Sequence, residues 1–460
     1  MDTVLAPQTS LRESYWRWIA LFFQAFFAFG FYYANDNPQA IKTRLLDPPT
    51  SLTSFEFNLL YSLYQLPNMI LPLFGGFFID YFGIRLGIGI FSFVVIGGHA
   101  LFTFGVFESS FSVMVLGRLL FALTGENISV SQSTIISKWF RQKELAFAFG
   151  SSIIAVRLGG MANNIVTPRI AHSTNSAWFP CFLGVLTCIV SFIFALVVIW
   201  MDYKADKTEG KLRSQHQAND PSTQIRLSDL KKFNFFFWLI LVNSLLVYSV
   251  LSAFLSSAND FLVKQFNIDE IEAGNMLLII YIVSMCVSPL IGMIIDRIGQ
   301  RTFLLNVATL LMIGSLLMFL LIPGDEDTLK LLVALSLFLF GAGYAIYTAT
   351  QWSCISLVVE EKTLGTAYGI AAACTNGGGA LVLIIVGHLQ DAAKDYKAGY
   401  AWSTIFLAVL AGFGLASGVM LRTLNQKRNG NLDDPLLTKR KASIAIAEDL
   451  LFVDHRNNIN

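Results

Sequence analysis

The chain has 460 residues, of which 55% are apolar, only 14% are charged and 40 are phenylalanine. A soluble globular protein carries about a quarter charged residues, so the composition excludes that class and indicates a membrane protein with many spans. The net charge of +1 gives no sign of nucleic-acid binding. The cysteines all lie within apolar runs, so we expect no disulfide, no metal site and no cofactor.

About twelve apolar runs are long enough to cross a bilayer as helices. In chain order we expect them at residues 16–34, 55–78, 86–107, 111–137, 144–170, 177–201, 234–255, 273–295, 303–322, 331–358, 363–388 and 401–421. The longest polar break separates the sixth run from the seventh and divides the chain into two sets of six helices.

The distribution of basic residues predicts the orientation. Most of the 32 lysines and arginines fall on the side of the membrane that holds both chain ends and the central break, and the side rich in basic residues is normally cytosolic. We therefore predict a cytosolic N-terminus, an N-terminal bundle, a cytosolic linker, a C-terminal bundle and a cytosolic tail at 1–15, 16–202, 203–233, 234–422 and 423–460.

Two charged residues lie deepest in the apolar runs, Glu126 in the fourth and Arg157 in the fifth. The polar stretch 140–143 lies midway between them, so in an antiparallel helix pair both would lie about 20 Å above the turn. That depth is near the middle of a bilayer core about 30 Å thick. A charge there is costly unless it is paired or lines a wet cavity. The acid and the base therefore predict a site suited to a zwitterion.

The same two charges have a plainer interpretation, a structural ion pair that fastens the fourth helix to the fifth. Two further charges lie nearer the predicted lumen. We expect Arg118 to be a snorkelling or gate residue. We expect Asp36, which precedes Asn37 and Pro38, to be a helix cap or gate residue rather than a proton carrier. At this point both interpretations of Glu126 and Arg157 stay open.

A short pattern, G-x-x-x-D-x-x-G-x-R, occurs once in each half of the chain. Its members are Gly76, Asp80, Gly83 and Arg85 after the second run, and Gly292, Asp296, Gly299 and Arg301 after the eighth. The first glycine lets helices pack closely and the second permits a tight turn. The aspartate and the arginine are suited to form a charged contact at the membrane face.

This duplicated pattern resembles the signature of the major facilitator superfamily. The resemblance covers nearly all of the membrane region. It implies an all-α membrane fold of twelve transmembrane helices in two pseudo-symmetric six-helix bundles, with a central cavity and alternating access.

Local strings resemble one branch of that superfamily, the lysosomal dipeptide transporters known as major facilitator superfamily domain-containing protein one. The strings are D-N-P with Ala40 at 36–40, G-E at 125–126, K-E-L at 143–145 and L-G-T-A-Y-G at 364–369. The resemblance implies export of dipeptides from lysosomes without a proton gradient, and a glycosylated, single-span accessory subunit.

The resemblance also implies site residues. In that branch an acid on the fourth helix and a base on the fifth contact the dipeptide, and they correspond to Glu126 and Arg157. The residues expected to face the cavity are Tyr248, Tyr281, Trp352 and Asn376. The three glycines that follow Asn376 depart from the branch, so gating carried over to that helix is in doubt.

The tail contains D-D-P-L-L at 433–437, which fits the D-x-x-L-L pattern that trafficking adaptors read. We interpret Asp433, Leu436 and Leu437 as a sorting signal to endosomes or lysosomes. The one N-x-S/T sequon, at Asn127, lies inside the fourth run. The luminal loops would then carry no glycan of their own, which fits a protective accessory subunit.

Three functions fit these features. The favoured one is uniport of dipeptides across a lysosomal or endosomal membrane, because the second half has no carboxylate in the middle of a span and Arg157 should keep Glu126 charged. The alternatives are a transporter of another small solute, such as an amino acid or an organic anion, with or without proton coupling, and a membrane scaffold without transport. The sequence has no nucleophile–base arrangement and no phosphate-binding loop, so we predict no enzyme.

Overall fold

The computed structural model describes residues 11–435 apart from 13, 42–43, 46–47, 49, 53, 66, 142–143, 210–232, 269, 323–325, 392–395 and 429–431. Leu436 and Leu437 of the predicted sorting signal lie outside these residues, as does most of the predicted linker.

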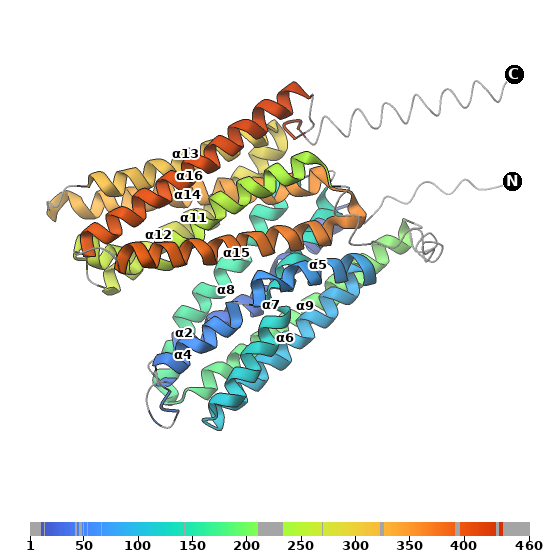
Figure 1. Cartoon of the computed structure of the whole chain (residues 1–460). Helices are drawn as coiled ribbons and strands as arrows, with labels where there is room; N and C mark the ends of the chain where they lie inside the picture. The colour runs from blue at the N-terminus through green and yellow to red at the C-terminus, as the bar shows by residue number, and fades with distance from the viewer. Residues whose placement is uncertain are drawn as a thin grey trace, which may run out of the picture. The chain divides into compact units, whose positions relative to one another are not determined.

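Within the described residues every regular element is a helix, so the predicted all-α class is confirmed. The elements, labelled in Figure 1, are α1 Trp16–Phe26, α2 Phe29–Ala40, α4 Ser54–Gln65, η1 Pro67–Met69, α5 Leu71–Phe82, α6 Ile84–Phe107, α7 Phe111–Phe140, α8 Leu145–Thr174, α9 Trp178–Thr208, α11 Phe235–Phe266, α12 Glu270–Ile298, α13 Arg301–Leu321, α14 Glu326–Val358, η3 Glu361–Thr363, α15 Leu364–Asp391 and α16 Tyr396–Lys427.

The first two apolar runs are each divided into shorter helices. The second run forms α4, the 3₁₀ turn η1 and α5. Pro67 fits that division, because proline has no N–H donor for the hydrogen bonds of a continuing helix. The first run forms α1 and α2, and α2 continues past Pro38 to Ala40. Asp36 therefore lies within a helix instead of capping its end.

Ten of the described helices are long and apolar enough to cross a membrane. Their starts lie close to the predicted ones, but several extend further at their ends. For example, α9 ends at Thr208 and α16 at Lys427, whereas the apolar runs predict ends near 201 and 421. Hydropathy detects the part of a helix that lies in lipid, and the backbone hydrogen bonds of the same helix continue into water.

The chain divides into two compact units. Unit 1 consists of Met1–Trp139, Ser151–Asn234 and Val359–Leu381. In this unit α9 packs against α1, α2 and α6. Buried Phe102, Val106 and Met114 belong to an apolar core that secures the ends of α6 and α7.

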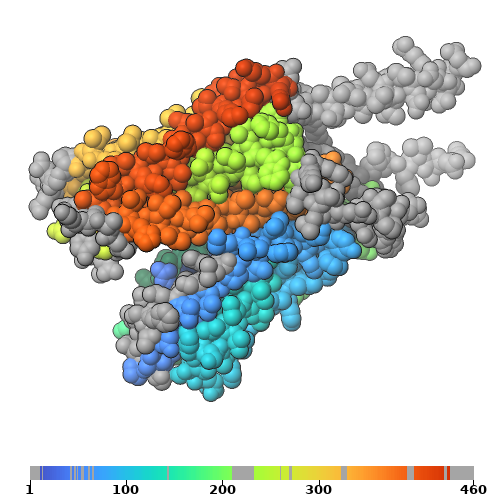
Figure 2. All heavy atoms as spheres, viewed as in Figure 1, coloured from blue at the N-terminus to red at the C-terminus, as the bar shows by residue number. Residues whose placement is uncertain are grey.

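Unit 2 consists of Phe140–Gly150, Phe235–Val358 and Val382–Asn460. Here α13 packs against α14 and α16, α12 packs against α14, and α11 packs against α16. Figure 2 shows α16 and α11 packed side by side on the face in view. The first residues of α8 belong to unit 2 and the first residues of α15 belong to unit 1. The boundaries predicted for the two bundles stay a prediction.

Candidate functional site

Tyr64, a buried tyrosine on α4, links the charged residues inside unit 1. Its hydroxyl donates a hydrogen bond to Oε1 of Glu126 over 3.3 Å. The centroid of its ring lies 5.0 Å from Cζ of Arg118. Glu126 and Arg118 are both on α7, about two turns apart. One side chain of α4 therefore contacts an acid and a base of α7.

Arg118 is enclosed within the unit, where its side chain is 0% exposed. Its Cζ lies 5.6 Å from the ring centroid of Phe121 and 6.0 Å from that of Phe102. Its Nη1 donates a hydrogen bond to the carbonyl oxygen of Asn35 over 3.4 Å. Aromatic faces stabilise a desolvated arginine by about 2 kcal/mol. The guanidinium is therefore held in place by rings and does not extend to a membrane face as a snorkelling group would.

Asp36 on α2 is a second acid of unit 1, near Arg118 and Arg157. The positive charges of Arg118 and Arg157 both act on its carboxylate, and Nδ2 of Asn35 donates a hydrogen bond to it over 3.0 Å. Glu126 and Arg157, both described, form no ion pair with each other, and the hydrogen bond of Glu126 comes from Tyr64. The two predicted charges thus belong to one cluster without neutralising each other directly.

Sequence reasoning missed the part that Tyr64 plays in this cluster. The second run contains two polar aromatics one turn apart, Tyr61 and Tyr64, and nothing in the sequence separates them. It also treated Asp36 as the end of a helix. The continuation of α2 beyond Pro38 places Asp36 on a helical turn inside the unit, and that continuation could not be read from the proline alone.

Two of the predicted cavity residues lie together in unit 2. Tyr248 on α11 and Trp352 on α14 have ring centroids 6.3 Å apart and planes at 77°. Tyr347 lies beside them, with its centroid 6.4 Å from that of Tyr248, and its hydroxyl donates to Oδ1 of Asn243 over 2.8 Å. Tyr347 is fully buried whereas Tyr248 and Trp352 are half-buried. The buried Tyr347 holds the neighbouring rings in place. Tyr248 and Trp352 together form a partly exposed surface with both apolar and polar groups.

The remaining predicted site residues are also described. Asn376, in the part of α15 that belongs to unit 1, donates from Nδ2 to the carbonyl oxygen of Asn68 over 3.1 Å. Tyr281 is half-buried on α12 in unit 2. The assignment of Asn376, Tyr281 and the other four residues to one substrate site stays a prediction.

The two aspartates of the duplicated pattern make matching contacts. Asp80 accepts hydrogen bonds from the backbone nitrogens of Gly365 and Thr366 over 2.8 and 2.5 Å. Asp296 accepts from the backbone nitrogens of Ala146 and Phe147 over 3.0 and 2.9 Å. The first N–H groups of a helix have no partner within it, and the helix dipole favours a negative charge there. Each aspartate therefore caps the start of another helix, α15 or α8.

The first glycine of each copy makes room for that cap. A Cβ on Gly76 would collide with the backbone of Gly365, and a Cβ on Gly292 would collide with the backbone of Ala146. Any larger residue would push the capped helix away from its aspartate. Glycine and aspartate one helical turn apart are thus parts of one contact, which is the physical reason for their spacing.

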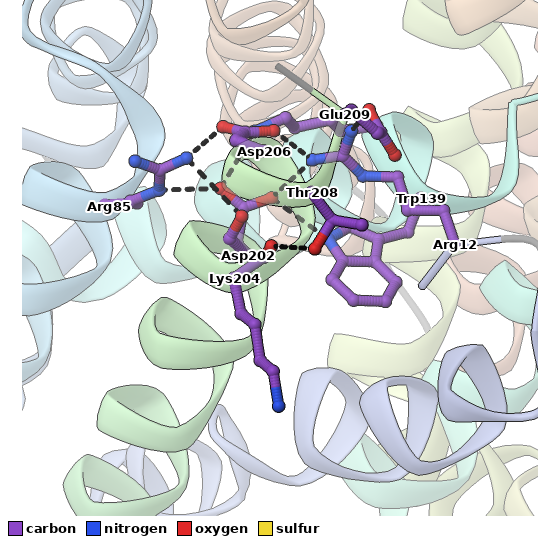
Figure 3. Close-up of polar contacts among 9 residues, drawn as sticks. Arg12, Arg85, Trp139, Asp202, Lys204, Asp206, Thr208 and Glu209 are labelled. Atoms are coloured by element: carbon purple, nitrogen blue, oxygen red, sulfur yellow. Dashed lines mark hydrogen bonds and ion pairs between the residues drawn. The ribbon is translucent and has the colours of Figure 1, made fainter. Parts of the chain in front are cut away.

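The arginine of the first copy enters a cluster of six charged side chains. Arg85 bonds to Asp202 and Asp206 on α9, and the same two carboxylates bind Arg12 and Lys138. Figure 3 labels Arg12, Arg85, Asp202 and Asp206 of this cluster together with Trp139, whose indole Nε1 donates to Asp202.

Three positive and three negative groups neutralise one another in this cluster, since Arg12 also pairs with Glu209 over 2.5 Å. Burial disfavours the charge of Arg12, but the carboxylates of Asp202, Asp206 and Glu209 outweigh that effect and hold its pKa above the usual value. The network ties the segment before α1 to the end of α9. In the second copy Arg301 has different partners, the backbone carbonyls of Leu432 and Asp434.

The described residues contain no group of three or more histidines, cysteines or acids placed to hold a metal ion.

The sequence-family model of the Major Facilitator Superfamily matches residues 17–383, which is most of the chain. The chain belongs to the Major Facilitator Superfamily. Together with the helices described above, ten of which can cross a membrane, this membership confirms the predicted all-α membrane fold of the superfamily. It also confirms that the protein is a membrane transporter and not an enzyme.

Among curated proteins, the chain is similar to the lysosomal dipeptide transporter MFSD1 of Danio rerio, with 31% identity over 92% of this chain and 90% of that protein. It is also similar to the protein of that name from Homo sapiens, with 30% identity over 91% and 88%. The resemblance to this branch that the local strings indicated is confirmed.

Two solved structures illustrate the shared fold. The proton:xylose symporter XylE superposes with a TM-score of 0.66 at 13% identity, covering 86% of this chain and 94% of that one. The human organic anion transporter MFSD10 (TETRAN) superposes with a TM-score of 0.62 at 13% identity, covering 87% and 98%. At such identities the likeness concerns the fold alone.

Proposed function

We propose that this transporter exports dipeptides from the lysosomal or endosomal lumen to the cytosol as a uniporter. The names of its curated relatives support the substrate and the compartment. The observation that carries the proposal is the cluster of Glu126, Arg118, Asp36 and Arg157 inside unit 1. Ionised groups are kept within membrane spans where a charged ligand or a pathway uses them.

In this proposal Glu126 binds the ammonium group of the dipeptide and Arg157 binds its carboxylate. The planar guanidinium suits the second task, because its N–H groups can hold both carboxylate oxygens. Before the substrate arrives, Tyr64 holds Glu126 and Asp36 offsets the charge of Arg157. When the dipeptide binds, its ammonium group takes the place of Tyr64 as the partner of Glu126, and its carboxylate takes the place of Asp36 as the partner of Arg157. Each charge therefore has a partner before and after binding.

Tyr248, Tyr281, Trp352 and Asn376 contact the part of the dipeptide between its two ends in this proposal. Aromatic rings with a polar edge accept apolar and polar side chains alike, so the transporter would accept many dipeptides. Specificity for the class would come from the charged ends, which all dipeptides share.

Alternating access would use the caps of the duplicated pattern. The bonds of Asp80 to the start of α15 and of Asp296 to the start of α8 are few and reversible. We infer that breaking and remaking both caps accompanies each transport cycle. The pattern's occurrence in both halves supports a movement in which the halves take equivalent parts.

Proton symport is the second candidate mechanism, and Asp36 favours it. With Glu126 it provides two carboxylates inside one unit, whereas sequence analysis counted on Glu126 alone. We favour uniport because the second half of the chain has no carboxylate in the middle of a span.

A glycosylated, single-span accessory subunit fits the same proposal. Asn127, the acceptor of the chain's one sequon, is 4% exposed on α7 and donates a hydrogen bond to the carbonyl oxygen of Leu123. A partner that carries glycans would shield the luminal loops. Unchanged survival of the transporter alone among lysosomal hydrolases would contradict this idea.

A thermal-shift screen of the purified transporter tests the substrate. Dipeptides, single amino acids and sugars are compared on the wild type, Glu126→Gln and Arg157→Ala, because a bound ligand raises the melting temperature of the folded state. Glu272→Gln is the matched control, since it removes an acid from an exposed pair with Lys330. We expect many dipeptides to stabilise the wild type and the control but neither site variant.

Uptake into proteoliposomes then tests the mechanism. A uniporter accumulates labelled dipeptide to the same level with and without a pH gradient, and a symporter concentrates it when protons flow inward. Stabilisation by dipeptides that survives both site variants would move the substrate elsewhere in the molecule.

A further inference from the structure

Residues 432–435, which follow the last helix, lie against the start of α13 in unit 2. Leu432 is 3% exposed, so the fold encloses it. This segment contains the acid of the D-x-x-L-L pattern, Asp433.

Asp433 acts as a helix cap supplied from a distant part of the chain. Its Oδ1 accepts a hydrogen bond from the backbone nitrogen of Thr302 over 2.8 Å, and its Oδ2 accepts from Oγ1 of the same residue over 2.6 Å. Nδ2 of Asn425 on α16 donates to Oδ2 over 2.9 Å. Gln300, which precedes α13, provides no side-chain cap of its own. The carboxylate therefore satisfies N–H and O–H groups that would otherwise lack a partner.

The backbone of the segment is held as firmly as its carboxylate. Arg301, which is 0% exposed, donates from Nη1 to the carbonyl oxygens of Leu432 and Asp434 over 3.1 and 2.9 Å. The backbone nitrogen of Gln300 donates to the carbonyl oxygen of Asp433 over 2.9 Å.

Gly299 makes the close approach of the tail possible. Its φ of +75° is rarely adopted by other residues, and a Cβ at this position would collide with the carbonyl oxygen of Asp433. Gly299 and Arg301 both belong to the duplicated pattern. The pattern in the second half thus builds a receptor for the tail as well as a cap for α8.

An adaptor that reads a D-x-x-L-L signal has to recognise its acid, and a carboxylate is recognised most strongly through charge-assisted hydrogen bonds. In this transporter the same carboxylate already accepts three hydrogen bonds from Thr302 and Asn425. The carboxylate of Asp433 cannot accept hydrogen bonds from Thr302 and Asn425 and from an adaptor at the same time.

We propose that the start of α13 is a docking site for Asp433, the acid of the predicted sorting signal, and that docking of this residue competes with adaptor binding. The proposal rests on the predicted cytosolic side of the tail but on neither the dipeptide substrate nor the uniport mechanism. Because a signal docked most of the time binds with an affinity lowered by the undocked fraction, the full transporter should bind an adaptor more weakly than its free tail does.

The test measures binding of a purified adaptor domain that recognises D-x-x-L-L peptides. Its ligands are a synthetic peptide of residues 423–460, the full transporter in detergent, and the variant Thr302→Val/Asn425→Ala. This variant removes two donors to Asp433 and leaves the signal intact. We expect the full wild type to bind roughly tenfold more weakly than the peptide, and the double variant to recover most of the difference.

Two variants within the signal complete the design. Asp433→Asn should abolish binding in the peptide and in the full chain. Asp434→Asn is the matched control, because only the backbone carbonyl of Asp434 takes part in docking, and it should not change the ratio between chain and peptide. Equal affinity of wild type and peptide would overturn docking. Failure of the peptide to bind, or binding that does not depend on Asp433, would overturn the signal. Neither result would bear on dipeptide transport.

Discussion

The two units contain the same pattern but bind its arginine in different ways. In unit 1 Arg85 bonds to ionised carboxylates on α9, within a buried network of six charges. In unit 2 Arg301 bonds chiefly to neutral backbone carbonyls of the tail, and its contact with Asp296 is longer at 3.7 Å. The aspartates, by contrast, cap a helix in both units.

The aspartate therefore has the same role in both units, whereas the arginine has a different role in each. The aspartate and its glycine are constrained by the start of a neighbouring helix, which is alike in both units. The arginine is constrained only to find acceptors near the end of another helix. Unit 1 supplies acids on α9, whereas unit 2 supplies the chain that follows α16. A buried charge with neutral acceptors is less costly to release than one within a charged network.

The largest effect is expected from breaking the charged network of unit 1. Asp202→Asn removes a fully buried carboxylate that binds Arg12, Arg85 and Lys138. Removing one partner of a buried ionic group leaves the others uncompensated and costs about 3–5 kcal/mol of unfolding free energy. Thermal unfolding in detergent measures the loss. Asp434→Asn is the control, because the side chain of Asp434 is exposed, and it should leave the melting temperature unchanged.

The caps of the two units are expected to be equivalent. Asp80→Ala and Asp296→Ala each remove a carboxylate that accepts two backbone hydrogen bonds at a helix start. Loss of such a cap costs about 1–2 kcal/mol. We therefore expect similar falls in stability, measured by the same unfolding assay, and a slower transport cycle in both variants. A large fall in stability for one variant and none for the other would refute an equivalent role for the two aspartates.

The sequence predicted the parts of this comparison that are repeated or periodic. The apolar runs located the long helices, and the repeated spacing predicted a charged contact between the aspartate and the arginine of each copy. That contact is present in the second copy, where Arg301 lies 3.7 Å from Asp296. In the first copy the prediction was wrong, because Asp80 bonds to the start of α15 and Arg85 to α9. The pattern could not identify the acceptors of Arg85 and Arg301, because these are brought together by folding from distant positions such as Asp202.

Prediction of the charged site was partial for the same reason. Depth along an apolar run singled out Glu126 and Arg157, since an ionised group in lipid is conspicuous. Tyr64 and Asp36 were not singled out as parts of one cluster, because a tyrosine in an apolar run is ordinary and a proline appeared to end the helix of Asp36. Whether these residues form the substrate site stays a prediction that mutation can test.

The interior of unit 1 contains the charged cluster, whereas the interior of unit 2 contains the aromatic residues around Tyr248. A variant of Tyr64 tests the charged cluster. Tyr64→Phe removes the hydroxyl that donates to Glu126 and keeps the ring beside Arg118. A hydrogen bond to a charged group contributes about 1.5–3 kcal/mol. We expect KM for dipeptides to change by roughly tenfold or more, with a smaller change in kcat. Tyr33→Phe is the matched control, because Tyr33 is also buried and its hydroxyl bonds to Thr167 outside the cluster.

The smallest effect is expected in the aromatic interior of unit 2. Trp352→Phe replaces the indole with a smaller ring, so the aromatic surface shared with Tyr248 becomes smaller. The hydrogen bond of Tyr347 to Asn243 is kept. An aromatic contact contributes about 0.5–1.5 kcal/mol beyond its buried area, so KM should change by a few-fold at most. The change should depend on the dipeptide, larger for bulky side chains than for two glycines, because the charged ends of every dipeptide would bind in unit 1. Competition between a bulky and a small dipeptide in proteoliposomes measures this ratio directly. If Trp352→Phe weakened all dipeptides equally, the division of labour between a charged unit and an aromatic unit would be wrong, and Trp352 would support the fold of unit 2 instead of contacting the substrate.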